Sequence, residues 1–448
     1  MPDQPSLADG EEGTRAMRHA VLSILMAASC SVAPYPASAL AQDQSSGRVA
    51  PRRALPAQGI SVAPSFDRAA FEASLNGQLQ GKGMGYAFVL MQDGRIISEG
   101  AGGAARDNQD GFLPMKTSTP VNIGSLFKFV AGVSMLHAME QPPSGAGFSG
   151  TDTNAKLDTP VSLLLPAFWK TGMSPRAAKL TFRDYLQHRT GFTTDNMLNE
   201  FRKPAPPGPQ RATVFNYQNL NFRVIGFALG AFVDPTWLSQ INQDSARTTS
   251  NENDMIYTRR ALGSFMDEYI RNTVMKKVPG GPVPSCDAAN EFKTTGAYAY
   301  KSKSDTGRGI ITSRKADGSG CVGSGGYWMS ARHLAAFASA ALNGNRLLSA
   351  QAQSLMYGAN NEPANRIVWT SARPRNWTAE HFGEPYVVWS GGRQIYEDTG
   401  NQISGGALLR LPDKHVLVIL HNSAELNSAS LEGQGYAAFI AGKAPYLD

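Results

Sequence analysis

Short apolar runs on either side of turn residues predict a β-hairpin near each end of the folded region. Toward the N-terminus, the apolar segment 86–91 leads into a Gln-Asp-Gly turn, and residues 95–99 form the returning strand. Toward the C-terminus, residues 406–411 and 416–420 flank a Pro-Asp-Lys-His turn in the same way. Both ends of the domain are therefore expected to contribute strands.

Helical spacing of apolar residues predicts helices between and around these hairpins. They are expected over residues 66–79, from 125 onward, and over 180–188, 222–232, 261–277, 330–342 and 430–440. Residues 237–256 are polar and look like an insertion. Strands at both ends and helices between them predict an α/β (α+β) fold. It would have one antiparallel sheet built from both termini, flanked by helices, with a mainly helical region inserted at about 165–320.

The start of the chain resembles an export signal over residues 1–41. A short basic stretch after Met17, which is a plausible true start, is followed by an apolar run over 20–28 and an Ala-Leu-Ala cleavage site at 39–41. The apolar run is too short to span a bilayer. We expect a periplasmic or secreted protein with no stable membrane insertion.

The next segment, residues 42–64, is rich in Ser, Pro, Ala and Arg and is expected to be a disordered linker. One domain would then occupy residues 65–448. Cys30 follows Ala-Ala-Ser and lacks the leucine of a lipoprotein signal, so we do not expect a lipid anchor there.

Removal of the signal leaves two cysteines, Cys286 and Cys321. An even, small number in an exported protein favours a disulfide, and two unrelated buried thiols are the alternative.

Composition narrows the function classes only slightly. The chain has 448 residues, 42% of them hydrophobic and 17% charged, and a formal net charge of +6. That composition is ordinary for a globular protein with a sizeable core. The lysines and arginines are scattered, without a basic block or interleaved aromatic residues, so we expect no nucleic-acid partner.

Candidate chemistry begins at Ser125, which stands after a small-residue turn and three residues before Lys128. Residues three apart share a helix face, so the amine can reach the hydroxyl. A serine needs a base to become nucleophilic, and a lysine desolvated by the neighbouring Phe127 and Phe129 could lose enough charge to help. An ordinary helix start followed by a surface lysine is the alternative for this pattern alone.

Two further segments carry suitable groups. Tyr217 and Asn219 stand in a polar turn before the 222–232 helix, where a phenol can move protons and an amide can hold a carbonyl. Asp398-Thr399-Gly400 precedes the last hairpin, where glycine would allow a strand edge to approach a bound acyl group. Each segment alone is also typical of a simple turn.

In this order, the three segments resemble the motifs of the serine β-lactamase and penicillin-binding-protein superfamily, in its class C-like branch of β-lactamases, DD-peptidases and carboxylesterases. Residues 186–191, 325–334 and 410–413 resemble its supporting motifs. The resemblance implies a β-lactamase/transpeptidase-like fold. A Ser-His-Asp triad is the competing chemistry, but the chain has no Gly-x-Ser-x-Gly elbow, and His188 is interpreted as a structural turn residue.

The resemblance also implies a role for each matching residue. Ser125 would be the nucleophile, Lys128 and Tyr217 would share the acid–base work, and Asn219 would hold the substrate carbonyl. The backbone N–H groups of Ser125 and Asn401 would form the oxyanion hole. The implied reaction needs no metal and no cofactor.

One position departs from the pattern, because the third motif begins with Asp398 where the superfamily usually has Lys or His. An aspartate there would repel a substrate carboxylate, unless the nearby Arg393 replaces the missing charge. We therefore expect an exported hydrolase of neutral or cationic esters or amides, including peptide-like ones. The alternatives are a class C-type β-lactamase or D-alanyl-D-alanine carboxypeptidase, and a catalytically silent binding or sensor domain. The oligomeric state stays open.

Overall fold

The computed structural model describes ten stretches of the chain. They are residues 66–141, 152–204, 214–278, 284–286, 292–311, 322–357, 366–369, 371–374, 386–396 and 402–443. The predicted signal peptide over 1–41 and linker over 42–64 lie outside these residues. So do five of the predicted site residues, namely Asp398, Thr399, Gly400, Asn401 and Cys321.

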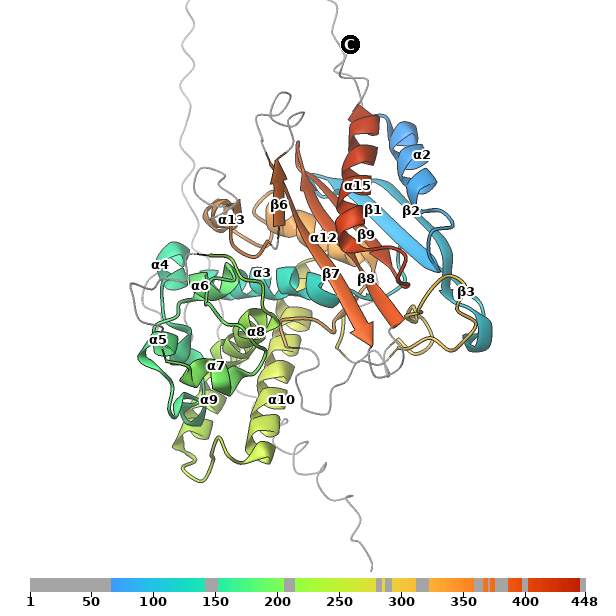
Figure 1. Ribbon diagram of the computed structural model, residues 1–448. Helices are drawn as coiled ribbons and strands as arrows, with labels where there is room; N and C mark the ends of the chain where they lie inside the picture. The colour runs from blue at the N-terminus through green and yellow to red at the C-terminus, as the bar shows by residue number, and fades with distance from the viewer. Residues whose placement is uncertain are drawn as a thin grey trace, which may run out of the picture. The chain divides into compact units, whose positions relative to one another are not determined.

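A seven-stranded antiparallel sheet organises the domain, with strand order β3-β2-β1-β9-β8-β7-β6 (Figure 1). Its strands are β1 (Gly85–Gln92), β2 (Arg95–Arg106), β3 (Leu113–Pro114), β6 (Ser371–Pro374), β7 (Tyr386–Tyr396), β8 (Gln402–Leu411) and β9 (His415–His421). The first strand pairs with the last, so the sheet is built from both ends of the chain, as the two hairpins predict. A separate short ladder joins β4 (Val121–Asn122) to β5 (Trp328–Met329).

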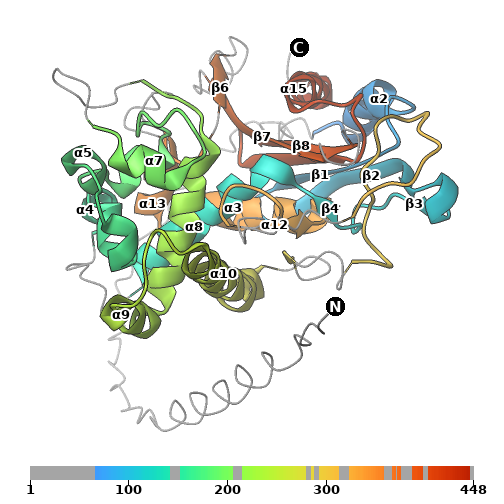
Figure 2. The ribbon, with the colours of Figure 1, turned by 60° about the horizontal axis from the view of Figure 1, so that its bottom comes forward.

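Helices cover both faces of this sheet (Figure 2). On one face, α2 (Arg68–Leu79) and α15 (Ser428–Lys443) pack over a core that includes Phe88 and Ile419. On the other, α3 (Phe127–Glu140) and α12 (Ala331–Leu342) pack over Val89 and Val418. Successive strand residues point to opposite faces, so the unbroken apolar runs of β1 and β9 supply both cores.

A mainly helical region lies beside the sheet. It contains α4 (Thr153–Leu157), α5 (Pro175–Ala178), α6 (Phe182–Leu186), α7 (Met197–Arg202), α8 (Asn219–Val233), α9 (Pro235–Gln243) and α10 (Glu252–Tyr269), and α13 (Ala350–Tyr357) follows later in the chain. A π-helical turn over Ile270–Val274 and a 3-10 turn over Met275–Lys277 continue α10. The apolar helix α8 packs against both α3 and α10.

The predicted elements are confirmed where the pattern is long. The structure has helices close to the predicted bounds at 66–79, 222–232, 330–342 and 430–440. The helix predicted over 180–188 is short, because His188 adopts a left-handed backbone with φ of 54°. The helix predicted over 261–277 begins earlier, where Asn251 caps the first turn of α10, so part of the polar segment 237–256 is helical.

Strand β7, which has Ser-Gly-Gly-Arg at its centre, is not among the predicted elements. The structure shows why glycine is needed there. A Cβ atom on Gly392 would collide with the carbonyl oxygen of Ile123 and the backbone nitrogen of Leu126. The strand therefore passes directly beside the segment that carries Ser125.

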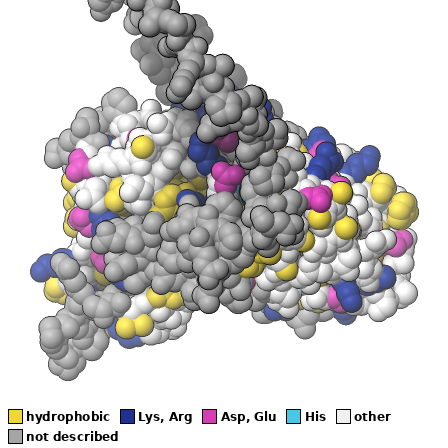
Figure 3. All heavy atoms as spheres, turned by 90° about the horizontal axis from the view of Figure 1, so that it is seen from above, with side chains coloured by type: hydrophobic (Ala, Val, Ile, Leu, Met, Phe, Trp, Pro, Cys, Tyr) yellow, Lys and Arg dark blue, Asp and Glu magenta, His cyan; other side chains and the backbone are white. Residues whose placement is uncertain are grey.

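The surface and the helices add two observations. On the described part of the face in Figure 3, acidic and basic side chains both occur among uncharged and hydrophobic ones. No single helix among the described residues has the length and apolarity to cross a membrane. The pair α8 and α9 meets both criteria only across a bend of 99°.

Candidate active site

Ser125 lies on a 3-10 turn over Gly124–Leu126 that leads into α3. Two contacts fix the turn against the short β4–β5 ladder. The backbone N–H of Ile123 donates to the carbonyl of Tyr327 (2.9 Å), and the Asn122 side chain accepts from the first N–H of the turn (3.0 Å). Ser125 itself is partly exposed. The local fold therefore holds its hydroxyl at an accessible helix start.

Lys128 is completely buried beneath Ser125, and its amine has three hydrogen-bond partners. Nζ donates to Ser125 Oγ (2.9 Å), to Asn219 Oδ1 (2.8 Å) and to the carbonyl of Ser324 (2.6 Å). The last bond depends on close packing, because a Cβ atom on the neighbouring Gly323 would collide with the backbone of α8. The three acceptors hold the amine in one position.

The surroundings of Lys128 lower the pKa of its amine and so favour the neutral form. Burial lowers the pKa of its amine to about 7, and this effect exceeds the opposing attraction of Asp195. Arg223, on the second turn of α8, lowers the pKa of Lys128 further. Neutral and charged amine are therefore both populated near neutral pH, which is the state that a general base requires.

Tyr217 approaches Ser125 from the other side. Its hydroxyl donates to Ser125 Oγ (2.8 Å), and its ring centroid lies 4.9 Å from Lys128 Nζ. Tyr217 is 37% exposed. Desolvation of the hydroxyl raises the pKa of Tyr217 to about 12. The tyrosine is thus protonated under conditions in which the lysine is partly neutral.

His188 supports Tyr217 from behind. The two rings stack with centroids 4.7 Å apart, and His188 Nδ1 accepts from the backbone N–H of Gln218 (3.3 Å). Burial, with the positive charge of Lys128 nearby, lowers the pKa of His188 to about 3. The ring is therefore neutral at physiological pH. It is a structural turn residue, and it also positions the phenol.

Asn219 and Asp195 complete the described part of the site. The oxygen of the Asn219 amide faces Lys128, while its nitrogen faces the carboxylate of Asp195 (Nδ2–Oδ2, 3.4 Å). Asp195 also accepts from the backbone N–H of Leu220 in the first turn of α8 (3.1 Å). Sequence reasoning missed Asp195, because a short polar residue after a turn is typical of an ordinary helix cap.

The third motif falls between β7 and β8, outside the described residues. Asp398, Thr399, Gly400 and Asn401 are therefore not placed, and their roles stay predictions. The strands on either side lie next to the Ser125 turn. Gly392 of β7 contacts the backbone of the turn that carries Ser125. The Ser404 hydroxyl of β8 donates to the carbonyl of Asn122 (3.0 Å).

Arg393 lies on the wrong side of the sheet to replace a missing cation. Its neighbour Gly392 faces the Ser125 turn, and side chains alternate along a strand. Arg393 pairs with Gly405 and, through it, with His421 on the face that α2 and α15 cover. Its charge is felt there, because it contributes to lowering the pKa of His421. The suggestion that Arg393 binds a substrate carboxylate is not supported by this placement.

Two other predicted features concern cysteines and metals. Cys286 is described, but Cys321 is not, so their disulfide stays a prediction. Within the described stretches, no group of three or more His, Cys, Asp or Glu side chains is arranged to hold a metal ion.

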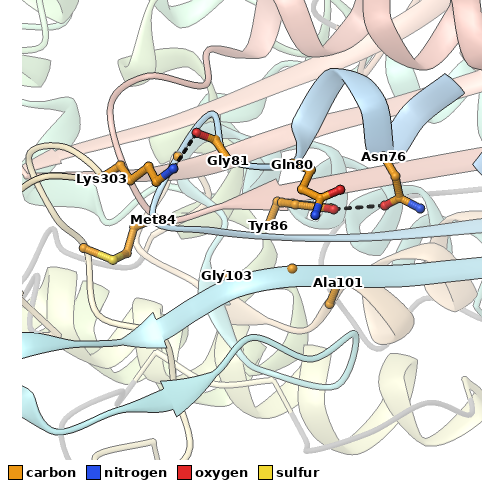
Figure 4. A pocket seen from close by; sticks show the side chains of 10 residues that line it. Asn76, Gln80, Gly81, Met84, Tyr86, Ala101, Gly103 and Lys303 are labelled. Carbon is orange, nitrogen blue, oxygen red and sulfur yellow. Dashed lines mark hydrogen bonds between the residues drawn. The ribbon is translucent and has the colours of Figure 1, made fainter. Parts of the chain in front are cut away.

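A cavity of about 450 Å³ lies away from these residues, between α2 and the glycine-rich part of β2 (Figure 4). Its polar groups pair with one another. The Tyr86 hydroxyl donates to Asn76 Oδ1 (2.9 Å), and Lys303 Nζ donates to the carbonyl of Gly81 (2.9 Å). Tyr86 belongs to the core under α2 and α15, on the sheet face opposite α3. This cavity is therefore separate from the Ser125 cluster.

Comparison with known proteins places this geometry in context. The family model described as Beta-lactamase matches residues 68–244, a segment that contains Ser125, Lys128 and Tyr217. A search of curated protein sequences finds no match.

Solved structures match over most of the chain. A class C β-lactamase from Rhodobacter sphaeroides superposes with a TM-score of 0.55 at 15% identity, covering 85% of this chain and all of that one. EstCE1, described as a hydrolase with promiscuous acyltransferase activity, superposes with a TM-score of 0.55 at 15% identity. The match covers 84% of this chain and 100% of EstCE1. The octameric penicillin-binding protein homologue from Pyrococcus abyssi superposes with a TM-score of 0.54 at 16% identity. The match covers 84% of this chain and 77% of the homologue. At these identities the structures show a shared fold, and the predicted fold is confirmed.

Proposed function

We propose that this protein, which belongs to the serine β-lactamase and penicillin-binding-protein superfamily, hydrolyses an ester or amide through an acyl-enzyme on Ser125. One observation carries the proposal. Ser125 Oγ lies 2.9 Å from the buried amine of Lys128 and 2.8 Å from the hydroxyl of Tyr217. A catalytically silent binding domain has no need for this arrangement.

The two partners divide the proton transfers according to their pKa values. Neutral Lys128 takes the proton from Ser125 as Oγ bonds to the carbonyl carbon of the substrate. Tyr217, protonated at neutral pH, supplies a proton to the leaving atom when its bond to that carbon breaks. The proton lost by Ser125 then returns to the tyrosine from the lysine.

Deacylation reverses these transfers. Water attacks the acyl carbon and gives up a proton to the same pair of residues. Ser125 Oγ regains a proton as the acid product leaves, so the enzyme is restored. Asn219 has a second amide hydrogen, besides the one directed at Asp195, that can hold the substrate carbonyl. The backbone N–H groups of Ser125 and Asn401 form the proposed oxyanion hole.

The substrate class is a neutral or cationic ester or amide rather than an anionic one. The motif that usually begins with a cation begins here with Asp398, and Arg393 faces away from Ser125. A carboxylate near Asp398 would therefore meet repulsion with no described arginine from β7 to offset it. The segment over residues 1–41 further supports export to the periplasm or the medium.

The proposal is tested by incubating the purified protein with a fluorophosphonate, short-chain nitrophenyl esters and a chromogenic cephalosporin. We expect covalent labelling of Ser125 and turnover of the neutral esters. Absence of labelling, together with no turnover of either the esters or the cephalosporin, would refute the hydrolase assignment.

Charge reversal tests the substrate class separately. Asp398→Lys should raise kcat/KM for the anionic cephalosporin relative to the neutral ester by about tenfold, which corresponds to about 1.4 kcal/mol. Asp398→Asn is the matched control, since it removes the negative charge without adding a cation, and we expect a smaller shift. An unchanged ratio in both variants would show that Asp398 does not select the substrate.

A further inference from the structure

A hydrogen-bonded chain of three side chains leads to Ser125 from the edge of the helical region. The carboxylate of Asp195 accepts from the nitrogen of the Asn219 amide, whose oxygen accepts from Lys128 Nζ. Lys128 Nζ in turn contacts Ser125 Oγ. An amide has one donor end and one acceptor end, so the carboxylate determines which end faces the lysine.

We propose that Asp195 is a positioning residue, which fixes the Asn219 amide and thereby holds Lys128 against Ser125. This inference rests on the proposed function and adds a residue that the superfamily motifs quoted above do not include. Reversal of the Asn219 amide would direct its N–H₂ group at the lysine amine. That arrangement would replace an attractive contact with a repulsive one and move the amine away from Ser125.

The segment that carries Asp195 is itself firmly held. The buried carboxylate of Glu200 accepts from the backbone N–H and the hydroxyl of Thr193 and from those of Thr194, at 2.9–3.2 Å. Arg223 Nη1 donates to the backbone carbonyl of Asp195 (3.3 Å). The side chain of Asp195 is exposed. These contacts keep an accessible carboxylate in one place beside the site.

The charged and titratable groups around Lys128 determine how its charge responds to mutation. Asp195 raises the pKa of the lysine, and Arg223 of α8 lowers it. Tyr217 and His188, the two titratable rings on the Ser125 side, are uncharged at neutral pH, because burial raises the pKa of the phenol and lowers that of the imidazole. Asp195 and Arg223 are thus the charges whose removal should shift the lysine, in opposite directions.

The test measures the rate constant for phosphonylation of Ser125 by a fluorophosphonate, followed by mass spectrometry, as a function of pH. In the unmodified protein the rate should rise with pH through a midpoint near the lysine pKa of about 7. Asp195→Asn keeps a side-chain oxygen for Leu220 but removes the charge. We expect its midpoint to fall by about half to one pH unit and its plateau rate to fall about tenfold.

Three further variants separate positioning from simple loss of structure. Asp234→Asn is the matched control, because Asp234 caps α9 through the N–H of Trp237 (2.8 Å) without contacting the site. This variant should change neither the pH midpoint nor the plateau rate. Asp195→Glu keeps the charge and should keep the midpoint. Arg223→Gln should move the midpoint to higher pH. If Asp195→Asn does not fold, this variant still tests how the midpoint responds to removal of a charge near Lys128.

The outcomes are distinct. The role of Asp195 would be overturned if Asp195→Asn left both the pH midpoint and the plateau rate unchanged. It would also be overturned if Asp195→Asn and Asp234→Asn had equal effects, or if Asp195→Asn and Arg223→Gln shifted the midpoint in the same direction. Failure of the unmodified protein to label at Ser125 would instead refute the proposed function on which this role rests.

Discussion

The two ends of α3 bring the same kinds of side chain together with different results. At the N-terminal end, Lys128 and Tyr217 both contact Ser125 Oγ. At the C-terminal end, Lys277 Nζ contacts His137 Nε2 (2.9 Å), and the Tyr269 hydroxyl contacts His137 Nδ1 (2.8 Å). Each cluster joins a lysine amine and a phenol through a third polar group.

Burial and the identity of the third group distinguish them. Lys128 is fully buried, whereas Lys277 is exposed to solvent. In the second cluster the buried group is His137, and burial with the nearby Lys277 charge lowers its pKa to about 4. We therefore expect acid–base chemistry at the first cluster, where the amine is buried and a serine hydroxyl lies between the lysine and the tyrosine, and none at the second.

Removal of the nucleophile should have the largest effect. Ser125→Ala is expected to lower kcat/KM for nitrophenyl esters by more than about a thousandfold while the melting temperature stays close to that of the unmodified protein. Ser134→Ala, a buried serine farther along α3, is the matched control and should keep full activity. Equal activity of the two variants would remove Ser125 from the mechanism.

The lysines provide the next test. Lys128→Ala should reduce kcat/KM for the same esters by at least about a hundredfold, because the base that takes the Ser125 proton is lost. Lys277→Ala should leave turnover within about twofold of the unmodified protein, since its amine is exposed and contacts His137 rather than a nucleophile. The comparison fails if both variants lose activity equally in steady-state assays.

The tyrosines should differ in the same direction. Tyr217→Phe removes the hydroxyl that contacts Ser125 and should reduce kcat by about a hundredfold, with its ring stack on His188 preserved. Tyr269→Phe removes only a contact to His137 and should affect stability by about 1 kcal/mol without changing kcat. A pre-steady-state measurement of acylation compares the two, and a slow acylation step in Tyr269→Phe would contradict the distinction.

The smallest effect concerns stability, and it belongs to the C-terminal cluster. The folded pKa of His137 is about 4, below the unfolded value near 6.5, so the unfolded chain binds more protons between these pH values. The free energy of unfolding should therefore fall as the pH drops from about 6.5 to 4, by up to roughly 3 kcal/mol for this residue. His137→Gln should flatten that part of the curve in urea titrations and leave ester turnover unchanged. A slope identical to that of the unmodified protein would show that His137 does not titrate on unfolding.

Local sequence determined much of this protein. The apolar pattern determined the two hairpins and the long helices, because short apolar runs bounded by turn residues suit strands and an apolar period of 3.6 residues suits a helix. The spacing of Ser125 and Lys128 placed hydroxyl and amine on one helix face within a single turn. Those contacts span three residues, so the chain needs no distant segment to bring them into register.

Tertiary structure decided the contacts between segments far apart in sequence. Tyr217 reaches Ser125, and Asp195 reaches the Asn219 amide, only because α8 packs against α3 and the 193–195 segment is tied to Glu200 and Arg223. Strand register likewise places Arg393 on the face away from Ser125, although it stands close to Asp398 in the chain. No local pattern specifies which segments pair or how deeply a lysine is buried. These depend on packing between distant elements, and that packing buries Lys128 and lowers the pKa of its amine.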